Sequence, residues 1–293
     1  MQIPAFLWKH SLTASLIQYF LWFILAGQSH TLCLKTMDHR RILTLARFTL
    51  LEAWRTRLPG LFAVVLALIF GAAYFFQELA ITESERVQVV FSAAASRLAA
   101  VFILSLYILT SIVREFNDKG LELTLSFDLR RSHYVAGRML GFLFIALMMA
   151  LIAGAPQLIF APVPAALQWI ASLALELAIV AALSVFCVMT FTQLMPAASF
   201  VAGFYLLART LSAIQLMGAS PIANREALSH QLMAWLVDAL ALVMPALDRF
   251  TQSAWLVDGA AGWASVALFA LQAAVYSSLL VAAAMFDFYR RNL

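Results

Sequence analysis

Long apolar segments recur along the chain between shorter polar stretches, and this pattern predicts membrane-spanning helices. A helix needs about 20 apolar residues to cross the hydrocarbon core of a bilayer. Helices are the expected spanning form, because each backbone polar group must find its partner inside the segment and no alternating barrel pattern is present. We therefore expect an all-α, polytopic membrane protein with six core transmembrane helices: Leu58–Phe76, Leu98–Val113, Met139–Phe160, Ile170–Met189, Pro196–Met217 and Trp263–Phe286.

A charged island, residues 114–138, separates the second predicted span from the third. Its polar and apolar residues recur with helical spacing. Such a stretch cannot lie in hydrocarbon, because each charged side chain near the bilayer centre costs several kcal/mol. Five of its residues are Lys or Arg, which indicates the cytoplasmic surface. We predict a cytoplasmic amphipathic helix that the spans on either side hold at the membrane, within reach of a soluble partner.

The distribution of basic residues predicts the orientation. If the first span runs outward, the cytoplasmic side receives twelve Lys and Arg residues and the opposite side receives four. By the positive-inside rule, both ends of the six-span unit are then cytoplasmic, in a multi-pass protein of the cell (inner) membrane. Of the four basic residues on the other side, Arg97 is expected to anchor the outer end of the second span.

The composition excludes several other classes of protein. Hydrophobic residues make up 64% of the chain and charged residues 12%, far from the balance of soluble domains. The net charge of +4 follows from the cytoplasmic basic residues, so it gives no reason to expect binding to nucleic acid. The two cysteines, Cys33 and Cys187, share no ligand-like spacing, and we expect neither a disulfide nor a metal site.

Sequence motifs of catalysis and nucleotide binding are missing. The chain has no phosphate-binding loop of the form G-x-x-x-x-G-K-[ST], no H-E-x-x-H and no G-x-S-x-G. Its five histidines have no shared spacing. We therefore expect a chain that is not an enzyme and that binds no cofactor itself.

Two regions do not fit the simple pattern of spans. Leu12–Ala26 is an apolar run of about 15 residues, which leaves open a signal-peptide core, an interfacial helix, a seventh span or a translated upstream region. Because a basic amphipathic stretch follows Met37, we interpret 1–36 as a peripheral extension and 37–293 as one transmembrane domain. Gln231–Phe250 is expected to form short interfacial or partly re-entrant helices, because two aspartates and a proline interrupt it.

The island resembles the segment between the second and third spans of ABC-2 type transporter permeases. The features that carry this resemblance are Glu115, Gly120, Leu121-Glu122, Leu125-Ser126, Arg130-Arg131 and Gly137-Arg138. Two positions depart from the family pattern, since Leu121 stands where Thr is common and Asp128 where Pro is common. The resemblance covers about 37–293, including a basic amphipathic segment before the first span.

The resemblance implies a permease subunit of an ATP-driven exporter. A second permease copy, or a homologous permease, would complete the membrane part within the membrane lipid. Two separate cytoplasmic ABC ATPase subunits would bind ATP and Mg. In this family, the segments corresponding to 40–57 and 114–138 touch the ATPase. The ATPase-coupling residues would be Glu115, Gly120, Glu122, Arg130 and Arg131, although a solvated charged face beside a bilayer is the ordinary interpretation of such a run.

Glu176 and Arg209 are the notable charges inside predicted spans. Their depths match in the proposed topology, so we predict an intramembrane ion pair between neighbouring helices, with a structural role favoured over substrate contact. Two other functions remain open. An ion-coupled secondary carrier would require more charges near the midplane and internal repeats. A non-transporting scaffold would use the island to recruit a cytoplasmic protein.

Overall fold

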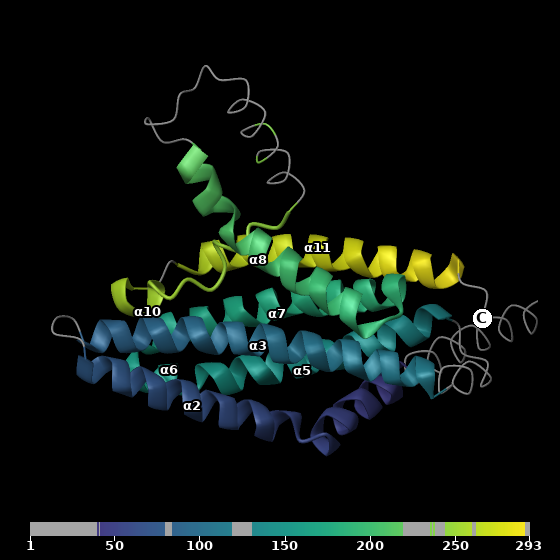
Figure 1. Ribbon diagram of the computed structural model, residues 1–293, viewed down its shortest axis with the longest axis horizontal. Coiled ribbons are helices and arrows are strands. Elements are labelled where there is room, and N and C mark those ends of the chain that lie inside the picture. The colour runs from purple at the N-terminus through teal and green to yellow at the C-terminus, as the bar shows by residue number, and fades with distance from the viewer. Residues whose placement is uncertain are drawn as a thin grey trace, which may run out of the picture.

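The computed structural model is a bundle of helices (Figure 1). It describes residues 40, 42–79, 84–118, 131–218, 235, 237, 244–259 and 262–290. Among these residues, six helices are long and apolar enough to cross a membrane and no strand occurs, which confirms the predicted all-α fold with six spans. The elements are α2 (Leu58–Leu79), α3 (Ser84–Asn117), α5 (Arg131–Gly154), α6 (Gln157–Phe160), α7 (Val163–Phe191), α8 (Leu194–Gly218), α10 (Trp255–Asp258) and α11 (Trp263–Arg290).

Helix α7 forms the centre of the bundle. It packs against α3, α5, α8 and α11, whereas α2 packs on the outside against α3 and α5 (Figure 1). In the most apolar 18-residue stretch of α7, 72% of the residues are buried, compared with 22% in α2 and 11% in α11. The side chains of Trp169, Leu173 and Leu177 are completely buried along it. The wide apolar faces of α2 and α11 are the surfaces that a bilayer would cover.

Helix α3 begins well before the predicted span, at Ser84 rather than at Leu98. Its first part is polar, but Gln88, Ser92 and Ser96 follow one another at every fourth position and are buried. Residues spaced in this way lie on one face of a helix. The early part of α3 therefore turns its polar side chains into the bundle, and the spanning helix is longer than its apolar core.

Prolines set the limits of the next two helices. The third span is interrupted at Ala155 and Pro156, and the short α6 follows before the chain turns. Pro156 has no backbone N–H to donate to the preceding turn. Helix α7 begins directly after Pro162, and Pro164 lies in its first turn, where the missing N–H costs nothing.

Before the first span, residues 42–55 of the segment expected to be basic and amphipathic form a helix. Leu51 and Trp54 expose 59% and 69% of their surface, whereas Ala53 is buried against the bundle. Exposed apolar side chains next to basic ones are typical of helices that lie in a membrane interface. The chain then turns at Arg57, whose φ of +55° is in the left-handed region, and α2 leaves at an angle (Figure 1).

Several predictions fall outside the described residues. These include the peripheral extension 1–36, the middle of the island with Gly120, Glu122 and Arg130, and most of Gln231–Phe250. From Met244 the chain is described again, and it reaches α10 without forming a long helix.

Candidate functional site

Charged side chains from three elements meet at one end of the bundle, which we call the basic end. Arg138, in the second turn of α5, lies between two carboxylates. Its Nη1 is 2.9 Å from Oε2 of Glu52 in the helix 42–55, and its Nη2 contacts Oε2 of Glu115 near the end of α3. Two further groups of α3 donate to Oε1 of Glu52: Nη2 of Arg114 at 2.6 Å and Oγ of Ser111 at 2.8 Å.

This charge cluster is partly shielded from solvent, which strengthens its ion pairs. The Arg138 side chain is only 9% exposed, and Oη of Tyr134 donates a 2.8 Å hydrogen bond to Glu115. Burial alone would raise the pKa of Glu52, but the hydrogen bonds and charges of Arg138, with Ser111 and Arg114, outweigh it and lower that pKa. Glu52 is therefore held in its ionised form.

Two glycines of α5 let the helix 42–55 approach closely beside the cluster. A Cβ atom on Gly137 would lie 2.9 Å from Cδ2 of Leu45, and one on Gly141 would lie 2.6 Å from Cβ of Thr49. Small residues four positions apart allow this kind of close helix packing in membrane proteins. The glycine pair and the charge cluster thus hold the same two helices together.

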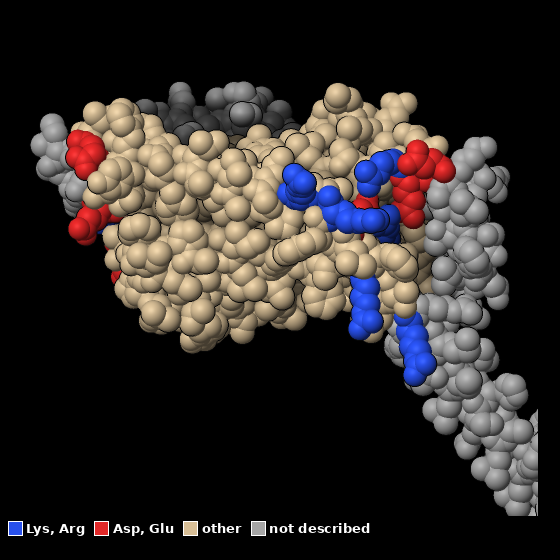
Figure 2. Space-filling view, turned by 90° about the horizontal axis from the view of Figure 1, so that it is seen from below, with Lys and Arg blue, Asp and Glu red and all other residues tan. Residues whose placement is uncertain are grey.

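The cluster lies where the two ends of the island meet the bundle. Glu115 lies just before the island's middle segment and Arg138 just after it, and both are connected to the helix 42–55 through Arg138 and Glu52. Figure 2 shows Lys and Arg side chains gathered at this end of the molecule, whereas most of the same face is uncharged. A displacement of the island would therefore act on three elements at once.

Sequence reasoning found only part of this cluster. Glu115 was expected to be functional and lies within it, and Arg131 is the first residue of α5. The side chain of Arg131, like Gly120, Glu122 and Arg130, lies outside the described part. Glu52 was missed, although it is the only acidic residue in the basic segment 40–57, and that signal could have indicated it.

Glu176 and Arg209 come together in the interior of the bundle. Nη1 of Arg209 in α8 is 3.7 Å from Oε1 of Glu176 in α7, and Oη of Tyr205 donates a 2.8 Å hydrogen bond to the same oxygen. Glu176 is fully buried. Arg209 also donates to the backbone carbonyls of Leu247 and Phe250, so it does more than balance a charge.

The segment 244–258, which we call the cap, is held by three arginines. Besides Arg209, Arg97 of α3 donates a 2.7 Å hydrogen bond to the carbonyl of Thr251, and Arg86 of α3 is 2.9 Å from Asp258. Arg97, which was expected to anchor the outer end of the second span, is 8% exposed and lies well inside α3. Its guanidinium binds the cap.

Before α10, the cap is irregular backbone that is partly buried among the helices. Thr251 has a φ of +45° and is completely buried, and its N–H donates to Oγ of Ser172 at 2.8 Å. Irregular backbone inside a membrane protein is tolerated where protein surrounds it and satisfies its polar groups. Around the cap, Oε2 of Glu176 and Nε of Arg97 are buried without a partner among the described residues.

Neither end of the bundle has a metal site in the part of the chain that the structure describes. No three His, Cys, Asp or Glu residues there are grouped as metal ligands. Cys187 is buried in α7.

The fold and these two polar sites define an α-helical membrane protein of the multi-pass kind. No known protein family and no curated protein matches the sequence.

Proposed function

We propose that this chain is the permease subunit of an ATP-driven ABC exporter in the cell (inner) membrane. The basic end would face the cytoplasm, where a separate ABC ATPase subunit would contact the helix 42–55 and the island 114–138. A second permease copy or a homologous permease would complete the membrane part. ATP and Mg would be bound by the ATPase, since the chain has no phosphate-binding loop.

The charge cluster at the basic end carries this proposal. It connects the amphipathic helix 42–55 to α3 and α5, the two helices that flank the island. Separating Arg138 from its carboxylates would leave charges that are partly desolvated, which is costly. The three elements are therefore expected to move as one unit when a partner displaces the island.

Such a unit suits a coupling mechanism with two states. ATP binding would close the ATPase pair, and the docked segments would follow that closure. The spans would then change from inward to outward access, which is a rigid-body switch of the kind that ligands commonly drive. The partner supplies the free energy because it binds one of the two states better than the other.

The first test is co-purification of the tagged chain with an ABC ATPase encoded in the same genome, with ATP hydrolysis measured in parallel. Glu122→Arg, in the middle of the island, should abolish both the association and the stimulation of ATP hydrolysis. Glu78→Arg is the control with the same change of charge, because Glu78 is exposed and lies at the opposite end of the bundle. It should leave both unchanged.

Two results would count against the proposal. If no ATPase is captured, or if both charge reversals weaken the association equally, the island is not the docking element. ATP-independent transport by the purified chain would instead support an ion-coupled carrier.

A further inference from the structure

The opposite end of the bundle contains an open cavity of about 560 Å³. Its walls come from the start of α3, from the turn between α6 and α7, and from the cap. Five of its seven lining residues are apolar: Val89, Phe160, Pro162, Leu256 and Val257. This volume is in the range of small-molecule binding sites, in which mostly apolar walls carry a few polar groups.

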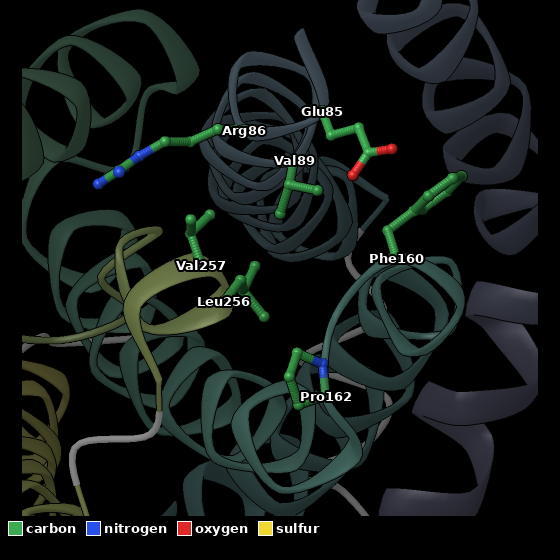
Figure 3. Close-up of a pocket in the computed structure, with 7 residues that line it drawn as sticks. All are labelled: Glu85, Arg86, Val89, Phe160, Pro162, Leu256 and Val257. Carbon is green, nitrogen blue, oxygen red and sulfur yellow. The ribbon is translucent and has the colours of Figure 1, made fainter. Parts of the chain in front are cut away.

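Two charged side chains of α3 also line the cavity, and they extend in different directions (Figure 3). Arg86 extends toward the cap, where its Nη2 is 2.9 Å from Asp258, so its charge is compensated. Glu85 lies on the same side of the cavity as Phe160 (Figure 3). No hydrogen bond or ion pair joins Glu85 to any described residue. Within the described part of the chain, Glu85 is therefore a carboxylate without a counter-charge, and it lines the same cavity as the aromatic ring of Phe160.

We propose that this cavity binds the headgroup of an aminophospholipid, with the lipid ammonium between Glu85 and Phe160. A primary ammonium donates hydrogen bonds to a carboxylate, and a cation is also attracted to the face of an aromatic ring.

A bilayer lipid is favoured over a free ligand by the surroundings of the cavity. The cavity lies at the end of the apolar spans α3 and α7, where a lipid headgroup region would be, and it is open to the outside. Its apolar lining continues to Phe160, whose ring stacks against Phe70 of α2 at 6.3 Å between centroids. The glycerol and upper acyl chain can follow this apolar surface. The proposal does not depend on the chain being a permease.

The test measures the thermal unfolding midpoint of the purified full chain in detergent as lipid is added. Phosphatidylethanolamine, phosphatidylcholine and phosphatidylglycerol share the phosphate but differ at the position of the ammonium. Binding to the folded state raises the midpoint, and the rise grows with the logarithm of the ratio of lipid concentration to Kd. We expect phosphatidylethanolamine to bind most tightly, phosphatidylcholine less tightly because its ammonium has no N–H, and phosphatidylglycerol least.

Variants assign this preference to the cavity. Glu85→Gln should reduce the affinity for phosphatidylethanolamine by about three- to fivefold and bring it close to that of phosphatidylglycerol. Glu78→Gln, an exposed carboxylate on α2 outside the cavity, should change nothing. Val257 is a partly exposed residue in the wall of the cavity. Val257→Trp would fill the cavity and should weaken the binding of all three lipids.

The opposite pattern would overturn the proposal. If the three lipids raise the midpoint equally, or if Glu85→Gln keeps the preference for phosphatidylethanolamine, the lipids act only as a general solvent for the apolar faces. A Leu268→Trp variant on the exposed face of α11 distinguishes binding in the cavity from general solvation of the apolar faces. It alters the exposed apolar surface but not the cavity.

Discussion

Arg138 is the residue on which the charge cluster depends, because one guanidinium serves carboxylates from two different elements. Replacing it with Met would keep much of its volume and leave Glu52 and Glu115 without their main partner. Loss of one member of a buried ionic group costs about 3–5 kcal/mol. The partial exposure of Glu52 and its remaining bonds from Arg114 and Ser111 place the expected loss at the lower end of that range.

The pH dependence of stability tests the state of Glu52. Its pKa is lowered in the folded protein, so its contribution to stability is present above its unfolded pKa of about 4.5 and is lost as the pH falls through the folded pKa. The difference in unfolding midpoint between the wild type and Glu52→Gln should therefore stay constant from about pH 7 to pH 5 and narrow below 4.5. A difference that grows at low pH would contradict this prediction.

Arg209 should matter more for stability than its ion pair alone suggests. Arg209→Met removes the donor to Leu247 and Phe250 and leaves the buried Glu176 carboxylate uncompensated, so we expect a loss of about 3–5 kcal/mol. Adding Glu176→Gln should recover part of that loss, because it removes the isolated charge. Denaturation in detergent measures both variants, and additive losses would show that the two residues are not coupled.

At the scale of elements, close packing of the helix 42–55 on α5 gives a sharp test. Gly141→Ala would place a Cβ atom 2.6 Å from Cβ of Thr49, so the two helices must separate. We expect a destabilisation of about 2 kcal/mol, measured as a lower unfolding midpoint. Gly203→Ala in α8 is the control. No atom lies within 4 Å of its added Cβ, and it should be neutral or stabilise the helix by up to about 1 kcal/mol.

The helices could be predicted from the sequence, but their ends were predicted less well. Hydropathy identifies a span by its apolar core, and all six cores were found. It cannot recognise helical turns whose polar side chains face inward, which is why the first turns of α3, with Gln88, Ser92 and Ser96, were left out. The start of α7 was missed for the same reason, because Gln168, which precedes the predicted span, is a buried polar residue.

The two polar sites differ in how far the sequence could reveal them. Glu176 and Arg209 are conspicuous because charges are rare inside apolar segments, and their matching depths suggested a pair. Glu52 and Arg138 lie in segments rich in charge, where nothing in a single sequence shows which residues meet. Their contact depends on the crossing of the helix 42–55 over α5, and that crossing depends on Gly137 and Gly141.

At the scale of the whole molecule, the two polar sites lie at different levels of one bundle built around α7. The cluster is at the basic end, whereas the cap and its arginines lie toward the end that contains α6 and α10. The proposed orientation puts the basic end in the cytoplasm and the cavity outside.

Cysteine labelling of intact cells would test this orientation. In a background with Cys33 and Cys187 replaced by Ala, Glu78→Cys should react with a membrane-impermeant maleimide, because Glu78 is exposed at the end opposite the cluster. Asp118→Cys, exposed at the basic end, should react only after the cells are made permeable. The reverse pattern would invert the topology and remove the island from the reach of a cytoplasmic ATPase.

The hydrogen bonds around Thr251 determine when the interior of the bundle can form during synthesis. Glu176 enters the membrane with α7, but its partners Tyr205 and Arg209 follow in α8. Arg97, made earlier still, has its partner Thr251 more than 150 positions away. During synthesis, the side chains of Glu176 and Arg97 are therefore in the membrane, or in the insertion machinery, before the groups that later neutralise or bind them have been made. The interior around Arg97 can therefore be completed only after the cap has been synthesised, behind the spanning helices α2, α3, α5, α7 and α8.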